Sequence, residues 1–109
     1  MKHVIDYSKI PGVKKTKQGI YAWTINELSD VMQLATTHQW IVLGGDVLFS
    51  NGDYTYDNWY YEPCPNEPLK INVYRSIEKC KNYIEAYVTK NGGEYLFALV
   101  LSSSFVSGC

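Results

Sequence analysis

The stretch that decides the fold is residues 40–61, WIVLGGDVLFSNGDYTYDNWYY. An apolar, β-branched run up to Phe49 is followed by Asn51-Gly52 and then by an aromatic run up to Tyr61. Asn-Gly between two strand-like runs is the strongest short-range signal for a β-hairpin with a two-residue turn. The sequence therefore predicts an antiparallel hairpin over about residues 40–61.

A two-residue turn fixes which residues of this hairpin lie opposite each other. Phe49 is expected to pair with Tyr54 and Val47 with Tyr56, on the face that points into the core, with Tyr60 further along the same face. The opposite face is expected to carry Asp46, Leu48, Asp53, Thr55, Asp57, Trp59 and Tyr61. A slip of one residue in the register exchanges the two faces.

Two pairings on the outer face follow from this register. Gly44 is expected opposite Trp59, where the indole covers the bare glycine. Asp46 is expected opposite Asp57, and two carboxylates directly across an antiparallel pair repel each other. Three explanations stay open: a bulge at Gly44-Gly45 that changes the register, carboxylates that await a cation from a partner protein, or an acid/base or metal-binding pair.

A helix is expected immediately before the hairpin. Thr24 and Glu27 form a capping-box pattern, and apolar residues then recur at helical spacing. The first helix is therefore predicted over about residues 25–37, and His38 at its end suits the helix dipole.

A second helix and a strand are expected after the hairpin. Apolar residues repeat at helical spacing from Val73 to Tyr87, so the helix begins near Asn72 or Ser76 and reaches about Lys90. The apolar run that follows Asn91-Gly92-Gly93 is typical of a central strand covered on both faces. The whole pattern predicts an α+β fold, in which an antiparallel sheet (hairpin about 40–61, strand about 94–101) packs with two helices (about 25–37 and 73–90).

Length and composition narrow the class of protein. The 109 residues are 46% hydrophobic and 19% charged, which predicts one folded domain over residues 1–109. A net charge of −1 predicts no nucleic-acid binding, and no stretch resembles a membrane span or a signal peptide, so a cytoplasmic location is expected.

Few residues are suited to metal binding or catalysis. The three cysteines have no CxxC spacing, so neither a disulfide framework nor a zinc site is expected. Cys80 falls on the apolar stripe of the second helix and is expected to be buried. The two histidines offer no catalytic set, so no cofactor, no metal site and no enzyme activity are predicted.

Charge is segregated along the chain. Residues 1–17 hold five lysines and a single acid, whereas residues 18–69 hold seven acids and no Lys or Arg. An acidic segment of this kind steers a cationic partner, although an acidic face kept only for solubility is the alternative. Aromatic residues among the acids favour an interface, because they bury a large area at low entropic cost.

Several segments carry a resemblance to a known family. They are Gly19-Ile20, Ala22-Trp23, Gly44-Gly45-Asp46-Val47, Tyr56-Asp57-Asn58-Trp59-Tyr60, and the helix from Ser76 to Tyr83-Ile84. Over about residues 18–101 the chain resembles an immunity-protein family of bacterial polymorphic toxin systems, the family numbered forty. The resemblance implies an α+β protein that binds and blocks the C-terminal toxin domain of a large secreted effector, such as a contact-dependent growth inhibition protein.

The residues and the resemblance together give one leading hypothesis. The chain is an immunity protein that neutralises a toxin domain, a nuclease and more specifically an RNase, by direct contact through an acidic aromatic surface. The expected toxin-binding residues are Asp46, Asp53, Asp57, Trp59, Tyr61 and Glu62. Two alternatives remain: a small ligand- or carbohydrate-binding module that uses Trp59 and Tyr side chains, and a small enzyme that uses the Asp46/Asp57 pair.

Overall fold

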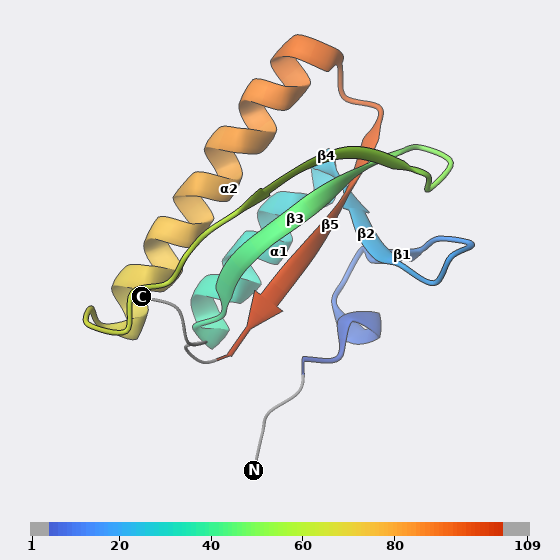
Figure 1. Ribbon diagram of the computed structural model, residues 1–109. Helices are drawn as coiled ribbons and strands as arrows, with labels where there is room; N and C mark the ends of the chain where they lie inside the picture. Colours follow the sequence, from blue (N-terminus) through green and yellow to red (C-terminus); the bar gives the residue numbers. More distant parts are fainter. Residues whose placement is uncertain (1–4, 104–109) are drawn as a thin grey trace.

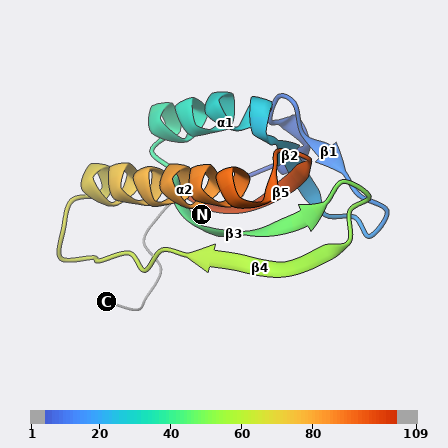
Figure 2. The same cartoon turned by 90° about the horizontal axis from the view of Figure 1, so that it is seen from above.

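The computed structural model describes residues 5–103 and has the α+β architecture that the sequence predicts. Five strands form an antiparallel sheet in the order β1-β2-β5-β3-β4. Both helices lie along one face of this sheet (Figures 1 and 2), and we call the other face the open face. No helix among the described residues has the length and apolar character needed to cross a membrane.

The first half of the fold runs from the edge strand to the first helix. A short 3-10 helix (Tyr7–Lys9) precedes β1 (Lys14–Lys15) and β2 (Tyr21–Thr24), and α1 (Ile25–His38) follows at once. The Glu27 carboxylate accepts hydrogen bonds from the Thr24 N–H (3.1 Å) and hydroxyl (2.8 Å). The predicted helix start at the capping box is therefore confirmed.

The second half contains the hairpin strands β3 (Ile41–Phe49) and β4 (Tyr54–Tyr60), helix α2 (Leu69–Asn91) and strand β5 (Tyr95–Ser102). The predicted central position of the last strand is confirmed, since β5 lies between β2 and β3. Its expected burial on both faces holds at Ala98, which is 8% exposed, but is wrong at Val100, which is 49% exposed.

One main core fills the space between the sheet and the helices. Its fully buried members come from every layer and include Trp23, Val31, Val47, Val73 and Phe97. Cys80 of α2 is also fully buried, as expected, and burial raises the pKa of its thiol to about 12. Cys80 is therefore a packing residue and not a reactive thiol.

Helix α2 begins earlier than the apolar repeat predicts. It starts at Leu69, directly after Pro68, so the predicted start near Asn72 or Ser76 is wrong. Asn72 lies in the first turn and is buried. Its side-chain amide forms hydrogen bonds with the backbone N–H and carbonyl of Cys64 in the preceding loop. Because Asn72 is polar, the apolar repeat does not include it. The helix start predicted from that repeat is therefore about one turn later than the observed start.

The hairpin is the part of the fold that differs most from the prediction. The turn is wider than two residues, because the Phe49 N–H donates to the carbonyl of Asp53 and the Gly52 N–H donates to that of Phe49. Leu48 pairs with Tyr54, but Asp46 pairs with Asn58 and Gly45 with Trp59. A bulge therefore places three residues of β4, Thr55 to Asp57, opposite Val47.

Because of this bulge, both predicted cross-strand pairs are wrong. Asp46 does not face Asp57, and Gly44 does not face Trp59, because Gly44 pairs with Tyr60. A bulge does change the hairpin register, but it lies in β4 and not at Gly44-Gly45, which pair regularly with Tyr60 and Trp59, so the predicted place of the bulge is wrong. A second irregularity lies just before the glycine pair, between Val42 and Gly44, in the pairing of β3 with β5.

Candidate functional site

The two sides of strand β4 and its continuation have different surroundings. Asp57, Trp59 and Tyr61 point toward α2, where their side chains contact Tyr87, Tyr83 and Asn72 respectively. The intervening residues alternate to the open face or to the sheet edge, because successive side chains of a strand point to opposite faces. The predicted assignment of the two faces is therefore wrong along β4, as a slipped register requires.

Trp59 is a core residue. It is only 7% exposed, and its ring stacks on Tyr83 at 4.7 Å between centroids and 25° between planes. The indole covers a bare glycine as expected, but the glycine is Gly45, where an added Cβ would lie 2.5 Å from the ring. The expected exposure of Trp59 is wrong, and no free face of its ring is left for a sugar to stack on.

Tyr61 anchors the end of the hairpin. Its hydroxyl donates to Asn72 Oδ1 at 2.8 Å, and the same oxygen accepts from the Cys64 N–H at 2.8 Å. Asn72 Nδ2 donates in turn to the carbonyls of Cys64, Glu67 and Pro68. Tyr61 is half-buried, and its polar group holds the proline-rich loop in place.

Asp57 lies at the surface, in a hollow between β4 and α2. Its carboxylate accepts from the Tyr87 hydroxyl at 2.8 Å. The hollow has a volume of about 320 Å³, and Tyr83 and Lys90 also line it. Burial, and then the hydrogen bond to Asp57, raise the pKa of Tyr87. Asp57 and Tyr87 thus lie at the polar edge of the stacked rings of Trp59 and Tyr83.

Three tyrosines of β4 are exposed, although the predicted register placed them in the core. Tyr54 is 42%, Tyr56 85% and Tyr60 69% exposed. The Tyr54 and Tyr56 rings lie 6.2 Å apart, and Lys79 of α2 lies 5.7 Å from the Tyr60 ring centroid. The Asp57-Asn58 pair was the available signal, since Asp and Asn are common where a strand is irregular.

The four acids expected at the site are all accessible. Asp53, Asp57 and Glu62 are exposed, and Asp46 is half-exposed on the open face between Asn58 and Ala98. Within residues 5–103 none of the four forms an ion pair, whereas Asp6, Glu27 and Glu67 pair with Lys9, Lys14 and Arg75. We define the β4 surface as Asp46, Asp53, Tyr54, Tyr56, Asp57, Asn58, Tyr60 and Glu62.

The geometry does not support paired-carboxylate chemistry. Asp46 is on the open face, whereas Asp57 turns toward α2, so the two carboxylates do not share a site. The described residues contain no group of three His, Cys, Asp or Glu side chains placed to hold a metal ion. The repulsion that the sequence suggested is relieved by the bulge in β4.

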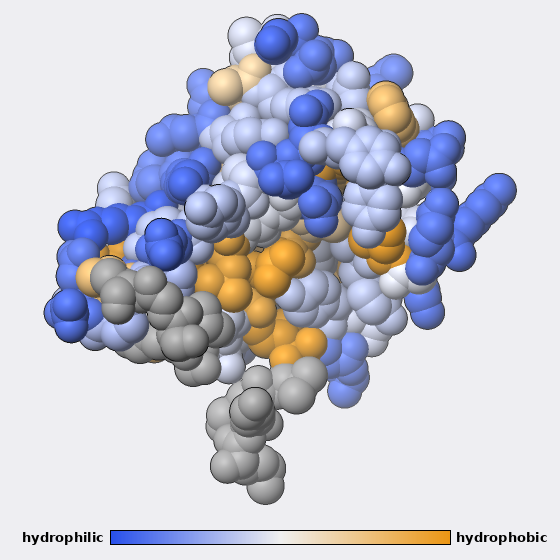
Figure 3. Space-filling model, in the orientation of Figure 1, coloured by the Kyte–Doolittle hydropathy of each residue, from blue (hydrophilic) through white to orange (hydrophobic). Residues whose placement is uncertain are grey.

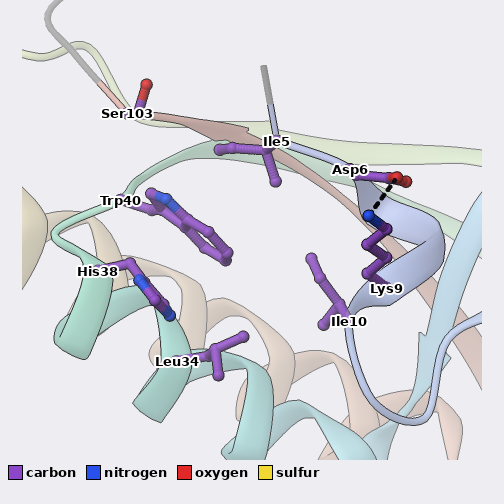
Figure 4. A pocket seen from close by; sticks show the side chains of 8 residues that line it. All are labelled: Ile5, Asp6, Lys9, Ile10, Leu34, His38, Trp40 and Ser103. Carbon is purple, nitrogen blue, oxygen red and sulfur yellow. Dashed lines mark ion pairs between the residues drawn. The ribbon is translucent and has the colours of Figure 1, made fainter. Parts of the chain in front are cut away.

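A second hollow, of about 610 Å³, is lined by none of the residues of the β4 surface. Figure 4 shows its lining, which comes from the first described residues, the end of α1 and the starts and ends of strands: Ile5, Asp6, Lys9, Ile10, Leu34, His38, Trp40 and Ser103. His38 stacks on Trp40 at 5.0 Å. Asp6 and Lys9 form an ion pair, and hydrogen bonds from Ser8 lower the pKa of Asp6. None of the expected toxin-binding residues lines this hollow.

The face of the molecule seen in Figure 1 carries an apolar area (Figure 3). The apolar atoms gather over the lower ends of β3 and β5, and more hydrophilic side chains lie above them. The fold and these surfaces define a small protein whose sheet, backed by helices on one face, presents accessible acidic and tyrosine side chains from its edge strand. Exposed aromatic side chains and apolar areas of this kind are typical of surfaces that contact another molecule.

Comparison with known families identifies the class more closely. The model of the family described as immunity protein 40 matches residues 13–101. The chain belongs to the immunity protein 40 family, as the resemblance in the sequence indicated. It is therefore an immunity protein, and its partner is a toxin that it neutralises. Comparison with curated proteins and with solved structures found no match.

Proposed function

We propose that the chain blocks the C-terminal toxin domain of a polymorphic toxin, of the contact-dependent inhibition kind, by direct contact through the β4 surface. It acts in the cytoplasm and has no catalytic activity of its own. The observation that carries the proposal is the set of four accessible carboxylates, which form no ion pair within residues 5–103, together with three exposed tyrosines. Such a surface offers aromatic anchors and a field that attracts a cationic partner.

The charge of the β4 surface favours a nuclease as the toxin, and an RNase in particular. A nuclease holds phosphates in a cationic site, because phosphate groups dominate nucleic-acid affinity. An inhibitor of such a site gains from carboxylates placed where phosphates bind. Asp46, Asp53, Asp57 and Glu62 supply that charge from the hairpin and from the residues just beyond it.

The first experiment is genetic. The toxin domain encoded upstream of this gene is expressed in a laboratory bacterium with and without the chain. We expect growth arrest that only this chain relieves. Arrest that persists in the presence of the folded chain would contradict the immunity role against that domain.

The surface itself is tested with two matched double variants. Asp46→Lys with Asp57→Lys reverses two charges on the β4 surface, and Asp30→Lys with Glu85→Lys reverses two exposed acids on the helices. We expect the first pair to slow association with the purified toxin domain by about tenfold at low salt, and the second pair to change it far less. Equal effects of the two pairs would show that net charge, and not this surface, governs binding.

A further inference from the structure

Tyr56 has an unusual backbone conformation. Its φ is +69°, in the left-handed region that bulky residues rarely adopt. The side chain is 85% exposed, more than any other large apolar or aromatic residue in the described chain. Burial therefore does not explain this conformation.

Local hydrogen bonds hold the bulge that produces this conformation. The Thr55 hydroxyl donates to the Val47 carbonyl at 2.8 Å and accepts from the Asp57 N–H at 3.1 Å. On both sides of the bulge the strand pairing is regular, with Leu48 opposite Tyr54 and Asp46 opposite Asn58. The sheet thus fixes a strained residue whose ring lies 6.2 Å from that of the exposed Tyr54 and stays 85% exposed, so it adds little to the packing of the fold. Strain of this kind gathers at ligand-binding positions.

We propose that Tyr56 is the central anchor of the toxin interface, inserted into an apolar hollow of the toxin with a cationic border. This inference rests on the proposed function and adds to it the residue that determines the lifetime of the complex. Tyrosine is among the residues that dominate interfaces, and such anchors lie near the centre of a contact. Asp57 follows Tyr56 directly in β4, and Asp46 on β3 pairs with Asn58, two residues beyond Tyr56. Neither forms an ion pair in residues 5–103, so both complement a cationic border.

Two other ways of covering β4 fit the structure less well. A second copy paired along the same edge would bring Asp53, Asp57 and Glu62 of both copies together, and like charges across strands are destabilising. A partner strand that extends the sheet would meet the bulge at Thr55–Asp57, and bulges interrupt such pairing. A side-chain anchor needs neither arrangement.

The test replaces Tyr56 with a residue that accepts the same backbone conformation. Asn adopts the left-handed region, so Tyr56→Asn removes the ring without adding strain. We expect the complex with the purified toxin domain to dissociate at least about thirtyfold faster, with association changed by less than about threefold, since the acids remain. The matched control is Tyr74→Asn, at an exposed tyrosine of α2 (63%), which we expect to change dissociation less than about twofold.

Thermal unfolding separates binding from stability. We expect Tyr56→Asn to unfold at or above the temperature of the original protein, and Tyr56→Gly to unfold above Tyr56→Ala, because only Ala keeps the strain. An Ala variant that unfolds at or above the Gly variant would overturn the inference. So would a Tyr56→Asn complex that dissociates as slowly as the original, or a chain that is dimeric through β4 in sedimentation.

The two proposals fail in different ways. A folded original protein that does not bind the toxin domain at all would contradict the proposed function. Tight binding by the original protein and equally tight binding by Tyr56→Asn would contradict only the role of Tyr56.

Discussion

The two sides of strand β4 show how one aromatic strand serves both folding and recognition. On the side toward α2, Trp59 is buried and stacks on Tyr83, and Tyr61 is hydrogen-bonded to Asn72. On the other side, Tyr56 and Tyr60 are 85% and 69% exposed. The same class of side chain therefore stabilises the fold on one side and remains available to a partner on the other.

This difference has a consequence for substitutions along the strand. Changes on the side toward α2 are expected to affect the free energy of unfolding, whereas changes on the exposed side are expected to affect toxin binding. Paired variants test this separation, in which a residue on one side of β4 is compared with a similar residue in a more exposed position.

The largest expected effect is at Trp59. Trp59→Ala removes a buried ring whose indole N–H has no partner within residues 5–103, so the loss is one of packing. We expect the free energy of unfolding to fall by about 3–5 kcal/mol in a denaturant titration. The control Tyr60→Ala is expected to cost less than about 1 kcal/mol, including its contact with Lys79. Similar losses for both variants would remove the distinction between the two sides.

The next largest effect is expected at Asn72, which accepts a hydrogen bond from Tyr61 just beyond the end of β4, on the side toward α2. Asn72→Ala removes the oxygen that accepts from the Cys64 N–H and from the Tyr61 hydroxyl, and the amide that donates to the Cys64 carbonyl. Because buried polar groups left unpaired are costly, we expect a loss of about 2–3 kcal/mol of unfolding free energy. Asn82→Ala, at an exposed position of the same helix, is the control and is expected to change stability by less than about 0.5 kcal/mol.

Gly45 tests how closely Trp59 approaches β3. A Cβ at Gly45 would lie 2.5 Å from both the Trp59 ring and the Ala98 carbonyl oxygen, so Gly45→Ala must displace one of them. Overpacking of this kind is expected to cost about 1–3 kcal/mol in denaturant unfolding. Gly93→Ala is the control, because the nearest atom to its Cβ, in Val88, is 3.9 Å away. An unaffected Gly45→Ala variant would show that the contact is looser than the structure has it.

Local signals in the sequence locate both helices and β5. The Thr24–Glu27 pattern placed the start of α1 correctly, since capping depends on residues three positions apart. The apolar repeat located α2 but not its first turn, where Asn72 is buried because of hydrogen bonds to a loop. Propensity and periodicity carry no information about that loop.

The register of the hairpin depended on contacts that are distant in the sequence. Asn-Gly favours a two-residue turn, but the pairing is decided by Trp59 packing between Gly45 and Tyr83, a residue of the later helix. Successive side chains of a strand point to opposite faces, so an error of one residue in the register exchanges the two faces. The predicted register therefore places Tyr56 and Tyr60 in the core. The accessibility of the four acids could be expected from the sequence, because exposure of a carboxylate does not depend on that register, and their contact with a toxin stays a prediction.

The smallest expected effect concerns Tyr87 of α2, whose hydroxyl donates a hydrogen bond to the Asp57 carboxylate of β4. Tyr87→Phe removes a hydrogen bond to an exposed carboxylate, so we expect a loss below about 1 kcal/mol near neutral pH. Burial and Asp57 raise the pKa of Tyr87 above its ordinary value of 10.0, so the phenol loses its proton at lower pH in the unfolded chain than in the folded one. Its contribution to stability is therefore complete below about pH 10 and declines as the pH rises through the folded pKa. In unfolding titrations at increasing pH, the original protein should lose its advantage over Tyr87→Phe, whereas Tyr74→Phe should follow the original protein throughout. A constant difference between the original protein and Tyr87→Phe would contradict the raised pKa of Tyr87, which burial and then the hydrogen bond to Asp57 produce.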